Sequence, residues 1–125
     1  MASILLDHFY KIDSLAKEEA SISARVTFEV GHPIFKGHFP DMPIVPGVCQ
    51  TQMLSEVLSQ GLGTELQLKS AASIKFLSVV DPTRNPTLDL VITFTQLEDG
   101  YNVSAQYKWG ETTFFKFKGI FAAQA

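Results

Sequence analysis

The feature that most constrains the fold is a helix that must be buried on nearly all of its sides. Residues 47–63, GVCQTQMLSEVLSQGLG, contain no proline and end in two glycines, which predicts a helix of about four turns with a glycine stop. At about 100° per residue, the apolar side chains surround most of the helix axis instead of forming one stripe. They are Val48, Cys49, Met53, Leu54, Val57, Leu58 and Leu62. Other elements must therefore wrap around this helix.

Six runs of the chain have the composition and alternation of β-strands. Two precede the helix, at 8–13 and 20–30, and four follow it, at 66–80, 87–97, 101–109 and 112–122. Turn residues at 81–86, 98–100 and 110–111 separate the last four runs at hairpin spacing. The sequence predicts an α+β fold, in which an antiparallel sheet of about six strands wraps around one long central helix. At 125 residues, we expect a single domain over 1–125.

The charge balance argues against two classes of partner. Ten basic and thirteen acidic residues give a net charge of −3, so no basic excess exists to attract nucleic acid, and no polybasic segment exists to reach a membrane surface. The N-terminal MASILLDHFYK lacks a basic region before its short apolar run, so we expect no signal peptide. With one cysteine, Cys49, and no apolar stretch of about 18 residues, the predicted location is the cytoplasm.

A proline-stiffened loop at 31–46 places a histidine shortly before the helix. Four prolines predict that this segment contains no helix. The imidazole of His38 can accept a proton near neutral pH. The helix N-terminus beyond it offers unpaired amides to an oxygen that becomes negative, and Gly47 has no Cβ to block a substrate. These groups are suited to removing a proton next to a thioester carbonyl.

The segment FKGHFPDMPIVPGV, residues 35–48, resembles the signature of the 3-hydroxyacyl-[acyl-carrier-protein] dehydratases. SIKFLSVVDPTR and TTFFKFKGIFA are similar to later strands of that family. The resemblance implies a hot-dog fold, dimers with active sites at the subunit interface, His38 as catalytic base and the backbone amide of Gly47 as carbonyl-binding group. It also implies an acyl tunnel, and we expect Phe39, Pro46 and Val48 to bind the substrate. The matching residues are His38, Phe39, Pro40, Pro43, Pro46, Gly47 and Val48.

The family's acidic residue, fourteen positions after the histidine, is replaced here by Gln52. An amide can hydrogen-bond the departing hydroxyl group but cannot protonate it. Gln52 is then either a substrate-hydroxyl ligand in place of the acid or an inert residue that pairs across a subunit interface. Glu56 lies one helical turn further on, in a polar band with Gln52, Ser55 and Ser59. We expect Glu56 to be mainly structural, with substrate binding or a replacement acid as the alternatives.

Three functions remain open from the sequence. The leading hypothesis is a 3-hydroxyacyl-thioester dehydratase of fatty-acid or specialised acyl-chain biosynthesis, active alone or with an acid-bearing hot-dog subunit. The second is a non-catalytic or heterodimer-partner subunit that binds acyl carrier protein, and the third is an acyl thioesterase that uses Glu56. The resemblance implies acyl carrier protein as partner, a homodimer or heterodimer, and a substrate carried on the phosphopantetheine of acyl carrier protein or CoA. We expect no metal and no other cofactor.

Overall fold

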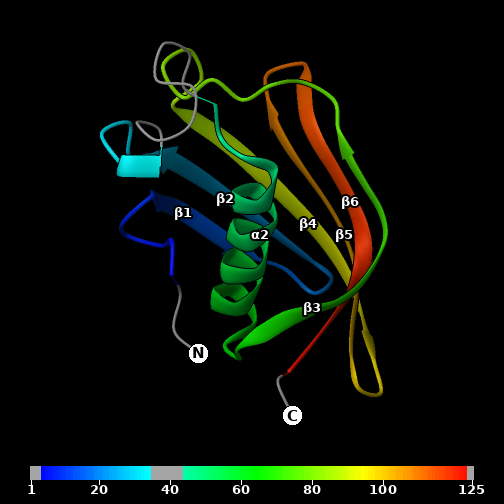
Figure 1. Ribbon diagram of the computed structural model, residues 1–125. Helices are drawn as coiled ribbons and strands as arrows, with labels where there is room; N and C mark the ends of the chain where they lie inside the picture. The colour runs from blue at the N-terminus through cyan, green and yellow to red at the C-terminus, as the bar shows by residue number, and fades with distance from the viewer. Residues whose placement is uncertain (1–3, 35–43, 124–125) are drawn as a thin grey trace.

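A computed structural model describes residues 4–34 and 44–123 of the chain. One antiparallel sheet curves around the long helix α2 (Gly47–Leu62), which lies in its concave face (Figure 1). The strands are β1 (Tyr10–Lys17), β2 (Ser21–Phe28), β3 (Leu66–Phe76), β4 (Thr87–Leu97), β5 (Gly100–Trp109) and β6 (Thr112–Ala123). Their order in the sheet is β1-β2-β4-β5-β6-β3, which leaves β1 and β3 as the edges. The predicted α+β fold is confirmed.

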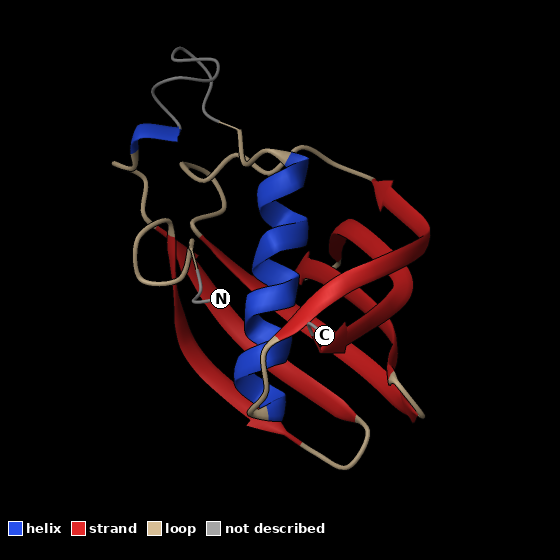
Figure 2. Cartoon of the chain, turned by 60° about the horizontal axis from the view of Figure 1, so that its bottom comes forward, coloured by secondary structure: helices blue, strands red, loops and turns tan. Residues whose placement is uncertain are grey.

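Local sequence explains where α2 begins and ends. The Pro46 carbonyl accepts hydrogen bonds from the amides of Cys49 and Gln50, at 3.0 and 3.1 Å, so the proline initiates the helix from an extended conformation. Gly63 ends it in the left-handed region at φ 70°, where its amide bonds the Ser59 carbonyl at 2.9 Å. Figure 2 shows α2 lying along the sheet. The predicted glycine stop is confirmed.

The core lies between α2 and the concave face of the sheet. Alternate residues of the central strands point inward, as the period of a strand requires. Tyr107 also donates its hydroxyl hydrogen to the Gln50 carbonyl at 2.7 Å, which ties β5 to the helix. The buried phenylalanines of β6 belong to this core. The central buried residues are Ile22, Val26, Met53, Leu54, Val57, Leu58, Leu88, Leu90, Ile92, Tyr107, Phe115, Phe117 and Phe121.

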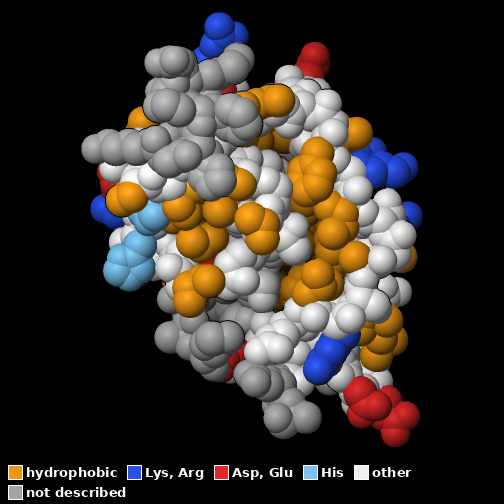
Figure 3. All heavy atoms as spheres, in the orientation of Figure 1, with side chains coloured by type: hydrophobic (Ala, Val, Ile, Leu, Met, Phe, Trp, Pro, Cys, Tyr) orange, Lys and Arg blue, Asp and Glu red, His pale blue; other side chains and the backbone are white. Residues whose placement is uncertain are grey.

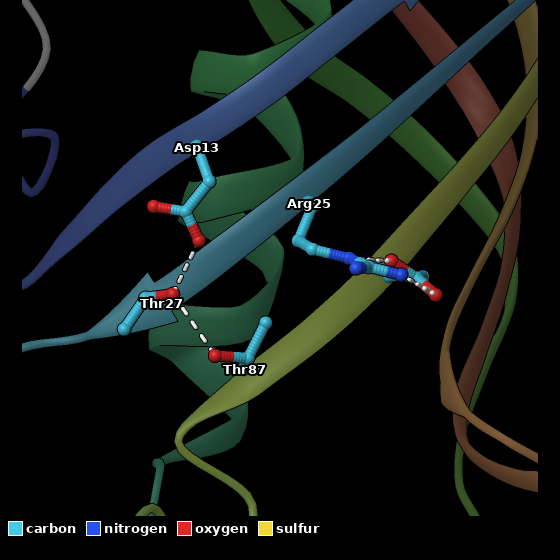
Figure 4. A network of polar contacts seen from close by, with 5 residues as sticks. Asp13, Arg25, Thr27 and Thr87 are labelled. Carbon is cyan, nitrogen blue, oxygen red and sulfur yellow. Dashed lines mark hydrogen bonds and ion pairs between the residues drawn. The ribbon is translucent and has the colours of Figure 1, made fainter.

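The convex face of the sheet carries polar side chains that pair across strands. Figure 4 shows the Thr27 hydroxyl between Asp13, to which it donates, and the Thr87 hydroxyl at 3.0 Å. Arg25 pairs with Asp89 at 2.9 Å. These contacts join β1, β2 and β4 on the side away from α2. They lie apart from the predicted site, and they help to hold neighbouring strands of the sheet together.

Two local predictions differ from the structure. Residues 33–34 are helical, so the expectation of no helix in 31–46 is wrong there, because proline is tolerated in the first turn of a helix. The first strand begins at Tyr10, not at residue 8, and reaches Lys17, because residues 5–9 form a turn. In that turn the Phe9 amide bonds the Leu5 carbonyl at 2.7 Å, and Asp7 has φ 67°.

Candidate functional site

An open groove of about 370 Å³ lies between α2 and the start of β3. All four members of the predicted polar band, Gln52, Ser55, Glu56 and Ser59, line it. Figure 3 shows apolar side chains gathered on this side of the molecule. The groove is lined by both apolar and polar side chains. Its full lining is Ile4, Val48, Thr51, Gln52, Ser55, Glu56, Ser59, Glu65, Leu66, Gln67 and Leu68.

The two serines of the band hold β3 against the helix. The Ser55 hydroxyl donates to the Leu66 carbonyl at 2.8 Å, and the Ser59 hydroxyl accepts from the Leu66 amide at 2.9 Å. Ser59 also donates to the Ser55 carbonyl at 2.8 Å. Both hydroxyls thus serve the backbone at the start of β3. They fix the width of the groove and are not positioned as nucleophiles.

Glu56 is the centre of a buried hydrogen-bond cluster. Its side chain is 4% exposed. Oε1 accepts from the Leu6 amide at 2.8 Å and from the Tyr10 hydroxyl at 3.0 Å. Oε2 accepts from the Ile4 and Leu5 amides at 3.0 and 3.1 Å and from Gln52 at 2.8 Å. Five donors fill the acceptor positions of the carboxylate.

This cluster favours the structural role of Glu56. A carboxylate that transfers a proton, or attacks a thioester, must give up at least one of the five donors. It would also have to leave a buried position. Each buried donor left without an acceptor costs about 1–3 kcal/mol. Sequence reasoning missed the role of the N-terminal segment, because three successive backbone amides leave no signal in side-chain identities.

Gln52 is half-buried in the groove. Its Nε2 donates to Oε2 of Glu56 at 2.8 Å, so the amide pairs within its own helix. Among the described residues, no donor is recorded for its Oε1. Gln52 therefore offers an available acceptor to the groove.

Pro46, Gly47 and Val48 form the helix N-terminus. Val48 is 77% exposed beside the groove. Within the described part of the chain, no acceptor is recorded for the Gly47 amide, as is usual for an amide in the first turn of a helix, and its role as carbonyl-binding group stays a prediction. A Cβ on Gly47 would lie 2.7 Å from Cζ of Phe76. The exposed ring of Phe76 thus lies where that Cβ would be, and a side chain at position 47 would require this ring to move.

His38 and Phe39, two of the predicted site residues, lie outside the described residues. Cys49 is buried, and this burial, with the nearby charge of Glu56, raises the pKa of its thiol, which favours a core role over a nucleophilic one. His32 accepts from the Ile34 amide at 3.1 Å and packs edge-on against Phe9, so it has a structural role.

Within 4–34 and 44–123, no three His, Cys, Asp or Glu side chains come together as they would around a metal ion. Over the same ranges, none of the helices has both the length and the apolar character that a membrane crossing requires.

Comparison with known proteins gives a consistent family. A family model described as ApeI-like, ApeI dehydratase, matches residues 14–114. The 3-hydroxyacyl-[acyl-carrier-protein] dehydratase FabZ of Chlamydia caviae is 36% identical over 69 residues, covering 50% of this chain and 45% of the relative. FabZ of Thermotoga petrophila is 36% identical over 77 residues, covering 61% and 53%. The chain thus spans about half the length of these curated relatives.

A solved structure supports the fold independently. The dehydratase heterocomplex ApeI:P from Xenorhabdus doucetiae superposes with a TM-score of 0.73. The alignment covers 89% of this chain and 96% of that one, at 19% identity. A likeness at this identity establishes the fold, so the predicted hot-dog architecture is confirmed.

Proposed function

This chain belongs to the ApeI-like dehydratase family, and from that premise we propose that it is a dehydratase subunit acting on 3-hydroxyacyl thioesters. The observation that carries the proposal is the family match over residues 14–114, which encloses the histidine loop, the whole of α2 and most of the sheet. The groove between α2 and the start of β3 is the proposed binding site. Phe39, Pro46 and Val48 are proposed to contact the acyl thioester there.

The proposed reaction is the elimination of water. His38 takes a proton from carbon 2 of the acyl chain, and the electron pair forms the new double bond to carbon 3. The carbon 3–oxygen bond breaks, and the hydroxyl group leaves as water once it receives a proton. Meanwhile the Gly47 amide, at the positive end of the α2 dipole, stabilises the negative carbonyl oxygen. This chemistry needs no metal and no redox cofactor.

The proton for the leaving hydroxyl is proposed to come from a second subunit. Gln52 has no acidic proton to give. Glu56, which the thioesterase alternative would also need, is occupied by five donors. The solved relative is a heterocomplex by its own description. We therefore favour an acid-bearing hot-dog partner over a homodimer.

The edge strand β3 is the proposed contact with that partner. Its outer edge has no neighbouring strand within the described chain. Large apolar side chains on and just after it are at least one-third exposed, more than an isolated surface normally leaves open. They are Leu68, Ile74, Phe76, Leu77 and Val79. A second hot-dog subunit would cover them and bring its acid toward the groove.

The acyl group is proposed to arrive on phosphopantetheine, carried by acyl carrier protein or by CoA. Support comes from the names of the curated relatives, which are acyl-carrier-protein dehydratases. The cytoplasm stays the predicted location, and Cys49, a free buried thiol, is compatible with a reducing compartment.

The test is an elimination assay on a 3-hydroxyacyl carrier thioester. The chain alone should give slow formation of the unsaturated thioester, and addition of an acid-bearing hot-dog partner should raise the rate roughly 10²–10⁴-fold, the usual effect of a positioned acid. A His38→Ala variant in the same mixture should abolish that gain. If the mixture with His38→Ala eliminates water as fast as the wild-type mixture, the partner supplies the base, and this chain has the non-catalytic accessory function. Full activity of the chain alone would remove the need for a partner.

A further inference from the structure

The hydrogen bond from Gln52 to Glu56 fixes which end of the Gln52 amide faces the groove. We infer that Glu56 is a positioning residue, which holds the amide nitrogen of Gln52 and so presents the amide oxygen to a ligand in the groove. The site then selects a ligand that donates a hydrogen bond, the 3-hydroxyl of a hydroxyacyl thioester, over a ligand that only accepts. The substrate class rests on the proposed function.

The orientation of the amide follows from its partner. A carboxylate has acceptor oxygens only, and Nε2 of Gln52 lies 2.8 Å from Oε2 of Glu56. A flipped amide would bring two acceptor oxygens to that distance without a hydrogen between them. Nitrogen therefore faces Glu56, and Oε1 is the atom left without a recorded donor among the described residues.

Glu56 cannot follow a turning amide, because it is fixed from several sides. The amides of Ile4, Leu5 and Leu6 approach it from the N-terminal segment, and the Tyr10 hydroxyl approaches from β1. It is 4% exposed, and a move further into the groove would leave buried donors without an acceptor. The orientation of Gln52 is thus set by contacts from residues about fifty positions away.

A hydroxyl bound in this way suits the elimination. When the 3-hydroxyl gives its hydrogen to Oε1, the lone pairs of the hydroxyl oxygen stay free to receive the proton that converts it into water. A 3-oxo group has no hydrogen to give to Oε1. A 3-oxo group would instead accept the second hydrogen of Nε2. Comparison of the 3-hydroxy and 3-oxo ligands therefore shows whether Gln52 binds through Oε1 or through Nε2.

The experiment compares three pantetheine ligands in which nitrogen replaces the thioester sulfur, so that carbon 2 is less acidic and elimination is suppressed. Their acyl groups are 3-hydroxyoctanoyl, 3-oxooctanoyl and octanoyl. Calorimetry on the wild-type chain should show the hydroxyl ligand binding about threefold to tenfold more tightly than the other two, as one neutral hydrogen bond provides. Gln52→Met should remove this preference. Glu56→Gln frees the Gln52 amide to turn, so it should also reduce the preference for the 3-hydroxy ligand until the three ligands bind almost equally.

The matched control is Tyr10→Phe, which removes one donor from Glu56 and leaves Gln52 paired. It should lower the melting temperature and keep the ligand preference. Equal loss of preference in Tyr10→Phe and Glu56→Gln would overturn the inference in favour of general loosening. Binding of the 3-oxo ligand as tightly as the hydroxyl ligand would also overturn it. If the wild type binds none of the three, the proposed function fails as well, a result distinct from equal binding of all three.

A second measurement decides the matter if Glu56→Gln does not fold. The side-chain amide hydrogens of Gln52 in the free wild-type protein should exchange with solvent more slowly than those of an exposed glutamine such as Gln60. Exchange at the same rate would mean that Glu56 does not hold the amide, and would overturn the inference.

Discussion

Replacing Gln52 by glutamate should create the acid that the groove lacks. The new carboxyl would occupy the place of an amide nitrogen that lies 2.8 Å from Oε2 of Glu56. Two negative charges at that separation repel by about 1.5 kcal/mol in a water-like medium and about 6 kcal/mol at an effective dielectric constant of 20. The pair therefore retains one proton between two oxygens, and the pKa of one carboxyl is raised.

The structure indicates which carboxyl takes the proton. Glu56 keeps four donors, from the amides of Ile4, Leu5 and Leu6 and the hydroxyl of Tyr10, and all four stabilise its negative charge. The introduced carboxyl has no such donors and faces the groove. It is therefore the protonated member of the pair, which is the form that a general acid requires.

The expected gain is roughly 10²–10⁴-fold in the elimination rate of the chain without a partner, the usual contribution of a positioned acid. It is read from the unsaturated thioester formed with the wild type and with Gln52→Glu. A Gln52→Met variant should show no gain, and His38→Ala should abolish the gain in the Gln52→Glu background. A Gln52→Glu variant that binds the ligand and reacts no faster than the wild type would refute this reasoning.

The same variant has a stability signature with a definite sign. Because the folded pKa of the introduced carboxyl is raised, its proton stabilises the folded state below the unfolded pKa, about 4.3 for glutamate, and this stabilisation is lost as the pH rises. Urea unfolding of Gln52→Glu relative to wild type should therefore show a deficit that grows from pH 5 to pH 8. A constant deficit would show that the two carboxyls do not interact.

Three further predictions concern stability. Glu56→Gln leaves at least two donors without an acceptor and should cost about 2–5 kcal/mol in urea unfolding, against about 1 kcal/mol for Tyr10→Phe; equal costs would contradict the five-donor cluster. Gly61→Ala places a Cβ 2.5 Å from Cδ1 of buried Ile22 and should lower the stability by about 1–2 kcal/mol, with partial recovery in an Ile22→Val background; a neutral variant would contradict this contact. Burial and the charge of Glu56 raise the pKa of Tyr107, so above about pH 10 the unfolded state ionises first and stability should fall by up to about 1.4 kcal/mol per pH unit from this residue. Tyr107→Phe should flatten that alkaline slope, and an unchanged slope would assign it to other groups.

The elements of the fold were predictable because their signals are local. Turn residues at 98–100 and 110–111 separate alternating runs, and β4 spans 87–97 as predicted. The polar band on α2 was also visible, because helical spacing alone places Gln52 and Ser55 on one side. Contacts between distant residues were not predictable. The ring of Phe76 over Gly47 joins positions about thirty residues apart, and neither position indicates the other.

The same distinction explains why the missing acid was identified from the sequence and the role of Glu56 was not. A substitution at a motif position can be recognised residue by residue, whereas the backbone amides of Ile4, Leu5 and Leu6 are present in any sequence. These contacts give Gln52 a second role besides replacing the acid, because it supplies one of the five donors to Glu56. A glutamate at position 52, 2.8 Å from Glu56, would have to keep its proton, and the pair would lose stability as the pH rises. An amide at 52 supports the anchor at any pH, which is consistent with an acid that resides on the partner chain in the proposed arrangement.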